Sequence, residues 1–226
     1  DSVKSRGLGD VYKRQEVALV LLIVGTFLSL LGSALLTVQK QRKVDLTERR
    51  LETIQSAIGS YLSKRGKLPC PAPIDVLPDD VAGRFGKEVN NGLCTGGAIA
   101  GTFDSLPAPR AAGDPSPYPA PRVRIGSVPV RDLDLSDDHM ADAWGTRFTY
   151  AVTQQQATID TSVVPEIRFQ PDGGAIDIQD VVGVSLLPSG MGTAYYVVIS
   201  HGPDQQGGIT LFGNNAVSVP CDTDPF

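Results

Sequence analysis

The stretch Glu16–Val38, EVALVLLIVGTFLSLLGSALLTV, decides how the rest of this chain folds. Directly after Glu16 come 22 consecutive residues, 17–38, without a single Asp, Glu, Lys or Arg. In a helix that rises about 1.5 Å per residue, such a run is about 33 Å long. Since the hydrocarbon core of a bilayer is about 30 Å thick, the composition predicts a membrane-spanning helix over residues 17–38.

The helical pattern continues after this run. No proline occurs before Pro69, and apolar residues recur on one helical face at Val44, Leu51, Ile54, Ile58 and Tyr61. Gly66 and Pro69 are typical of a helix end. The sequence therefore predicts one long helix over residues 16–66, apolar all round in its first half and amphipathic in its second.

The rest of the chain, residues 67–226, predicts one globular domain. Residues 68–121 are rich in proline and glycine and are expected to be mostly ordered loop. Short strands and one short helix, Leu133–Met140, are expected after them, with strands at Val123–Val130, Arg147–Val152, Ile167–Phe169, Ala175–Ile178, Val181–Leu187 and Ala194–Ser200. A long helix followed by antiparallel strands predicts an α+β fold, in which the helix packs on a small antiparallel sheet.

Charge is distributed unevenly along the chain. Residues 39–67 carry eight Lys/Arg and three Asp/Glu, a net charge of +5. Residues 68–226 carry eight Lys/Arg and nineteen Asp/Glu, a net charge of −11. The basic segment suits anionic lipid or an acidic neighbouring subunit, whereas the acidic domain argues against binding of nucleic acid.

The glutamate followed by VALVLLIVG resembles the N-terminal motif of type IV pilin-like proteins, including the pseudopilins of type II secretion. Glu16 matches the glutamate of that prepilin-type methylation motif, and Gly25 matches a glycine common in the same helix. Two further segments are similar to the family, in the expected order: Asp142-Ala143-Trp144-Gly145 with Tyr150, and SHGPDQQGG from residue 200 to residue 208. The segment LPCP at 68–71 is similar to a subgroup of bacterial pilin-like proteins. The resemblance implies a pilin-like fold, a single pass through the bacterial inner membrane and a periplasmic domain, and it makes Glu16 and Gly25 the residues of subunit assembly.

The first fifteen residues, DSVKSRGLGDVYKRQ, do not match the basic leader that prepilin peptidase removes in this family. Asp10–Gln15 resembles a translated sequencing adapter, so residues 1–15 are expected to be a scar rather than native sequence. Apart from the resemblance, Glu16 has a simpler interpretation, because an acid at the start of a helix is stabilised by the helix dipole.

The three cysteines are Cys70, Cys94 and Cys221. In an oxidising periplasm two of them are expected to pair. Cys70 and Cys94 lie in the same proline- and glycine-rich segment and are the favoured pair, with Cys221 as the competing partner for either. A disulfide that closes a loop of this length stabilises a fold by about 3–4 kcal/mol in the chain-entropy model.

No catalytic residues are predicted. Ser200, His201 and Asp204 are close in sequence, but neighbouring residues at a strand end point in different directions, and no nucleophile elbow, metalloprotease or phosphate-loop motif is present. The resemblance leaves a calcium ion open, with Asp204 as a ligand and Asp222 and Asp224 as distant candidates. Gln205 and Gln206 supply no carboxylate there, so no cofactor or metal is predicted.

The sequence thus predicts a non-enzymatic structural subunit, a minor pilin or pseudopilin, that resides in the inner membrane and assembles with other such subunits through its N-terminal helix. The alternative is a single-span, membrane-anchored periplasmic domain that binds or hydrolyses a ligand by itself. A pilus, a secretion pseudopilus and a DNA-uptake fibre are equally compatible with these residues.

Overall fold

The computed structural model describes residues 6–89, 94, 103–104, 123–158, 174–187 and 194–212; within the first helix it describes the side chains of residues 16–27 and 37–65. The chain divides into two compact units, Asp1–Asp45 and Leu46–Phe226. This division falls inside the predicted long helix of residues 16–66. Ile54, Ile58 and Tyr61 are buried in the core of the second unit, so the amphipathic half of the helix belongs to that unit.

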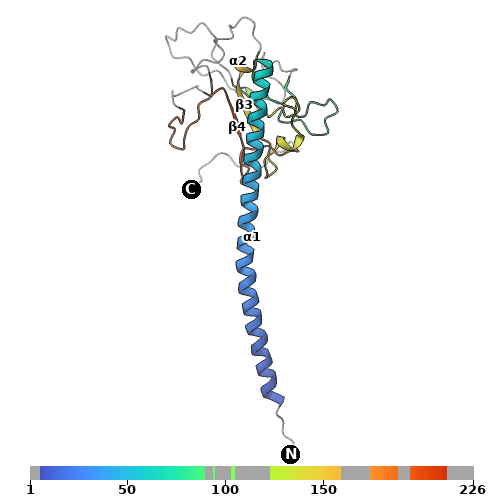
Figure 1. Ribbon diagram of the computed structural model, residues 1–226, viewed down its shortest axis with the longest axis vertical. Helices are drawn as coiled ribbons and strands as arrows, with labels where there is room; N and C mark the ends of the chain where they lie inside the picture. Colours follow the sequence, from blue (N-terminus) through green and yellow to red (C-terminus); the bar gives the residue numbers. More distant parts are fainter. Residues whose placement is uncertain are drawn as a thin grey trace, which may run out of the picture. The chain divides into compact units, whose positions relative to one another are not determined.

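Helix α1 runs from Arg6 to Arg65, labelled in Figure 1. It begins ahead of Glu16, where the sequence analysis placed its start, because no proline interrupts residues 6–15 and the backbone ladder continues through them. Its end is as predicted. Gly66 has a φ of 66°, and its N–H donates to the carbonyl of Leu62 at 2.8 Å, which is the left-handed cap that glycine favours. Within the described part of the chain, no helix has an apolar stretch of the length that a membrane span requires.

The second unit contains a four-stranded antiparallel sheet in the order β1-β2-β3-β4. The strands are β1 (Phe103–Asp104), β2 (Val123–Ser127), β3 (Thr149–Thr153) and β4 (Tyr196–Ile199). The 3-10 helix η2 (Asp137–Met140) lies between β2 and β3 in the chain, and the short helix α2 (Gln154–Ala157) directly follows β3. The α+β class and the antiparallel sheet are confirmed.

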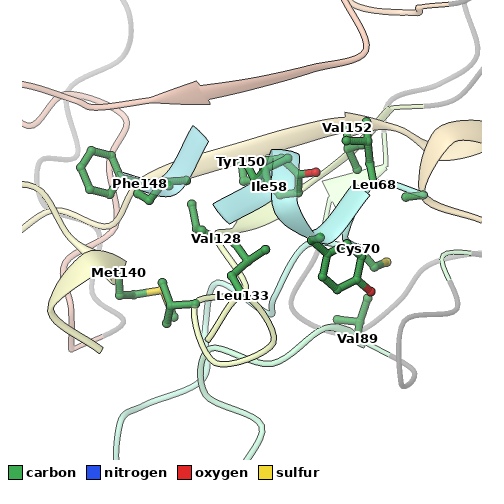
Figure 2. Packing of buried hydrophobic residues seen from close by; sticks show 14 of the residues in the cluster. Ile58, Leu68, Cys70, Val89, Val128, Leu133, Met140, Phe148, Tyr150 and Val152 are labelled. Atoms are coloured by element: carbon green, nitrogen blue, oxygen red, sulfur yellow. The ribbon is translucent and has the colours of Figure 1, made fainter. Parts of the chain in front are cut away.

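The core of the second unit lies between α1 and the sheet. Ile54 and Ile58 of α1 share one cluster of buried residues with Tyr150 and Val152 of β3 and with Val128, which follows β2. Figure 2 shows this cluster, and Figure 1 shows β3 and β4 beside the second half of α1. Of the predicted apolar face, Ile54, Ile58 and Tyr61 are therefore buried and Leu51 packs against them, whereas Val44 is exposed.

Three predicted strands differ in the structure. Arg147–Val152 was expected to alternate between buried and exposed residues, but in β3 the four consecutive residues Tyr150–Thr153 are all buried. Ala175–Ile178 and Val181–Leu187 form a tight hairpin joined by the isolated bridge Gln179–Ser185 instead of two sheet strands. The strand predicted at Ile167–Phe169 lies outside the described residues.

Candidate functional site

The first unit presents bulky apolar side chains to its surroundings. Between Val17 and Phe27, exposed fractions run from 45% at Ile23 to 67% at Leu22. The side chains involved are Val17, Leu19, Val20, Leu21, Leu22, Ile23, Val24 and Phe27. They cover all sides of the helix, and continuous exposed apolar surface of this kind marks contact with a protein or a membrane.

The two predicted assembly residues lie in this part of α1. Glu16 is exposed and sits ten residues inside the helix, because α1 begins at Arg6. The helix dipole acts mainly within the first turn, so it does not explain this glutamate in the present chain. Gly25 is also exposed, and a Cβ built on it meets no atom within 4 Å. No contact within the first unit thus requires a glycine there.

In the second unit, Asp142 ties three segments together. Its carboxylate is buried and accepts hydrogen bonds from the backbone N–H groups of Trp144 and Thr146, both at 3.0 Å. Its other oxygen accepts the hydroxyl of Ser200 at 2.8 Å, so the DAWG and SHGPD segments are in direct contact. On the opposite side, Arg50 of α1 donates to the carbonyl oxygen of Asp142 at 3.2 Å. The motif aspartate therefore links the helix, the turn before β3 and the turn after β4.

The turn after β4 is held by His201. One ring nitrogen of His201 bonds the hydroxyl of Thr149 at 2.8 Å, and the other bonds the carbonyl oxygen of Gln206 at 2.9 Å. Gly208 then passes so close to Thr146 that a Cβ at this position would overlap the threonine methyl group. Gly208 is thus needed for close packing of the two turns, whereas Gly207 supplies a positive φ of 69°.

These contacts show how Ser200 and His201, which are neighbours in the sequence, are engaged in the structure. Ser200 donates to Asp142, while both ring nitrogens of His201 are bonded to Thr149 and Gln206, so the described contacts do not pair the serine with the histidine. Among the described residues, no group of three His, Cys, Asp or Glu side chains is arranged to hold a metal ion. Asp222 and Asp224 lie outside the described residues.

The LPCP segment after α1 is anchored at two points. The predicted disulfide between Cys70 and Cys94 is present, with a Cα–Cα distance of 5.7 Å. The buried Tyr150 of β3 donates its hydroxyl to the carbonyl of Pro69 at 3.0 Å. Burial raises the pKa of Tyr150 well above its ordinary value, so this donor stays protonated. The third cysteine, Cys221, lies outside the described residues.

A buried cluster of three ionisable side chains was not predicted from the sequence. Lys67 and Glu88 form an ion pair at 3.9 Å, and their side chains are only 7% and 6% exposed. Burial raises the pKa of Glu88, and the hydrogen bond with Tyr61 and the charge of Lys67 oppose that rise. Burial also lowers the pKa of Lys67, an effect that the charge of Glu88 opposes. Each member of the pair therefore favours the charged form of the other, and Tyr61 adds to this effect at Glu88.

The role of Arg147 was also not predicted from the sequence, because a residue in an alternating strand has no feature that sets it apart. It is fully buried and donates to the carbonyl oxygens of Ile74, Val76 and Leu211 at 2.7, 2.7 and 2.6 Å. Its guanidinium lies over the ring of Phe85, 5.2 Å from the centroid. Burial lowers the pKa of Arg147 to about 10, so it is still charged at neutral pH. No local pattern signals this role, since every carbonyl it binds is distant in sequence.

In the second unit, hydrogen bonds thus join motif segments that lie far apart in the sequence. In the described part of the chain, the apolar surface of residues 17–27 is best suited to contact an external partner. Comparison with protein-family models, with curated proteins and with solved structures gives no match for this chain.

Proposed function

We propose that this chain is a structural subunit of the pilin or pseudopilin kind, which resides in a membrane through residues 17–38 and assembles side by side with other subunits through that segment. The observation that carries the proposal is the exposed apolar surface of residues 17–27. Burial of one bulky apolar side chain contributes about 1.5–3 kcal/mol, so this surface has a strong tendency to leave water.

The same helix supports the proposal in its second half. Residues 46–65 of α1 are built into a domain with its own core, in which Thr47 and Arg50 hold the DAWG turn. In the assembled state, Glu16 would lie among apolar helices, where a carboxylate is tolerated when a cation of a neighbouring subunit pairs with it.

Residence in a membrane is tested with Val24→Lys/Phe27→Lys in the full chain, because these exposed apolar residues lie near the middle of the proposed span. A lysine near the centre of a span costs about 2.5–3.5 kcal/mol, so we expect this variant to move from the membrane fraction to the soluble or aggregated fraction. Fractionation of cells followed by carbonate extraction measures the change. Leu77→Lys/Val81→Lys is the control, because these two residues are exposed in the second unit and should leave the chain in the membrane. An unchanged membrane fraction for the first variant would refute the proposed span.

Assembly is tested separately at Gly25. Small residues let membrane helices approach closely, so Gly25→Ile is expected to keep the chain in the membrane and to reduce cross-linking between copies. The readout is disulfide formation between copies that carry Leu22→Cys in a Cys221→Ser background. The neighbouring substitution Thr26→Ile changes a different side of the helix and serves as the control. A membrane-resident chain whose copies never cross-link would favour the alternative of an anchored domain that works alone.

A further inference from the structure

Basic side chains begin directly after the uncharged run of α1. Residues 17–38 contain no Asp, Glu, Lys or Arg, and the next charged residues in the chain are Lys40, Arg42 and Lys43. All three side chains are exposed. They belong to the first unit, as does the apolar surface of residues 17–27. We call Lys40, Arg42 and Lys43 the basic collar.

The basic collar keeps a positive net charge within its own unit. The acid that follows it there is Asp45, whose carboxylate accepts a hydrogen bond from Gln41 at 2.9 Å. Three cations and one acid give residues 39–45 a net charge of +2. In the other direction along the chain, the nearest charged residue is Glu16, at the far end of the uncharged run. No acid therefore lies between the basic collar and the apolar run.

The distance of the basic collar from the end of the run matches the thickness of a lipid headgroup layer. With a rise of about 1.5 Å per residue, the Cα atoms of Lys40 and Lys43 lie about 3 Å and about 7.5 Å beyond Val38 along the helix axis. The headgroup layer on each side of a bilayer is about 5–7 Å thick. If residues 17–38 fill the hydrocarbon core, the three cations thus lie at the depth of the phosphate groups.

The basic collar faces several directions instead of one. At about 100° per residue, Lys40 and Arg42 lie about 160° apart around the helix axis, and Lys43 lies between them. A protein that packs against one side of the helix would contact Lys40 or Arg42, but not both. Lipid headgroups surround a membrane-spanning helix, and the long stems of Lys and Arg let their charged ends reach the headgroups from any side. The arrangement therefore favours lipid over an acidic neighbouring subunit.

We propose that the basic collar binds the headgroups of anionic phospholipids at the edge of the membrane that residues 17–38 span. The proposal rests on the proposed function, because it requires this run to lie in a bilayer. It adds the class of lipid that surrounds the subunit and a contact that fixes the depth of the helix. Each Lys or Arg near an anionic surface raises the affinity for it about fivefold.

The test measures which lipid lies beside residue 38. The full chain carries Val38→Cys in a Cys221→Ser background and is labelled with a bimane fluorophore, which Cys70 and Cys94 do not take up because they form a disulfide. It is reconstituted into phosphatidylcholine vesicles with a small fraction of nitroxide-labelled phosphatidylglycerol or, in a parallel sample, nitroxide-labelled phosphatidylcholine. The ratio of the two quenching efficiencies gives the preference for the anionic lipid.

We expect phosphatidylglycerol to be preferred at least about fivefold in about 0.1 M salt, and the preference to fall toward one in about 1 M salt, where charges are screened within about 3 Å. Lys40→Gln/Arg42→Gln/Lys43→Gln should bring the ratio to about one in low salt as well. Quenching by nitroxide-labelled phosphatidylcholine should persist in this variant, because the uncharged run is intact.

The matched control removes three positive charges from exposed residues of the second unit, with Arg49→Gln/Lys64→Gln/Lys87→Gln. This variant should keep the preference of the unsubstituted chain. An equal fall in both variants would mean that overall charge sets the preference, and it would overturn the lipid inference.

Two further results separate this inference from the proposed function. Equal quenching by the two labelled lipids in the chain with an intact basic collar would overturn the lipid inference, while the quenching itself would leave the proposed span in place. Absence of quenching by either lipid would show that residue 38 lies outside the bilayer. That result would overturn both the lipid inference and the proposed span.

Discussion

Arg147→Met is expected to lower the free energy of unfolding of the second unit by about 3–6 kcal/mol. The substitution leaves the carbonyl oxygens of Ile74, Val76 and Leu211 without their common donor in a buried place. Loss of a partner for a buried polar group costs about 1–3 kcal/mol for each group. Methionine is of similar length and flexible, so a cavity contributes little to the loss.

Urea unfolding of the detergent-solubilised chain measures this effect, with Trp144 as the signal, because it is the one tryptophan of the sequence and lies beside Asp142. Arg84→Met is the matched control. Arg84 is an exposed arginine paired with Asp80 at the surface, and its loss should change stability far less. Equal stability of the two variants would mean that Arg147 does not hold the three loops together.

Lys67→Met is expected to destabilise the second unit by about 3 kcal/mol at neutral pH, because the buried Glu88 loses its cation and keeps only the hydrogen bond with Tyr61 to favour its charged form. Glu88→Leu should also destabilise the unit, because it removes the negative charge that opposes the effect of burial on the pKa of Lys67. The double substitution Lys67→Met/Glu88→Leu should restore much of the stability, because replacing a buried ion pair by apolar residues is often neutral or stabilising. A double variant that is less stable than both single variants would contradict this expectation.

The two single variants should respond to pH in opposite directions. The folded-state pKa of Glu88 is raised, so the folded state takes up its proton first and gains stability as pH falls toward the unfolded value of 4.5. Lys67→Met should therefore recover stability on acidification. The folded-state pKa of Lys67 is lowered, so Glu88→Leu should recover stability as pH rises toward 10.5. Urea unfolding at several pH values measures both trends. Parallel pH curves for the two variants would show that burial does not shift the pKa values of this pair.

Several features of the fold follow from local sequence. The spacing of Ile54, Ile58 and Tyr61 predicted the face of α1 that is buried, and Gly66 predicted the helix end. The Cys70–Cys94 pairing followed from their shared segment. Each of these depends on residues that are close in the chain, where periodicity and turn chemistry act directly. The start of α1 at Arg6 was missed because residues 1–15 were set aside as a scar.

The structural network was not predictable in the same way. Asp142 and Ser200 are 58 residues apart, and Arg147 reaches a carbonyl 73 residues earlier in the chain. Arg147 lies in a segment that was predicted as a half-exposed strand, and the sequence singled out neither Lys67 nor Glu88. A single sequence does not indicate which polar groups will meet when they are far apart in the chain, because these groups are brought together only when the core forms.

By itself, the sequence determined the long helix, its uncharged run, its amphipathic second half and the α+β class, since these depend on the residue types that recur within a few turns of one element. Only the tertiary structure decided that residues 46–65 belong to the globular unit, that Arg147, Lys67 and Glu88 are buried, and that Asp142 joins three segments. The physical reason is that burial of a charge is unfavourable until its partners are in place, and those partners come from parts of the chain that only folding brings together.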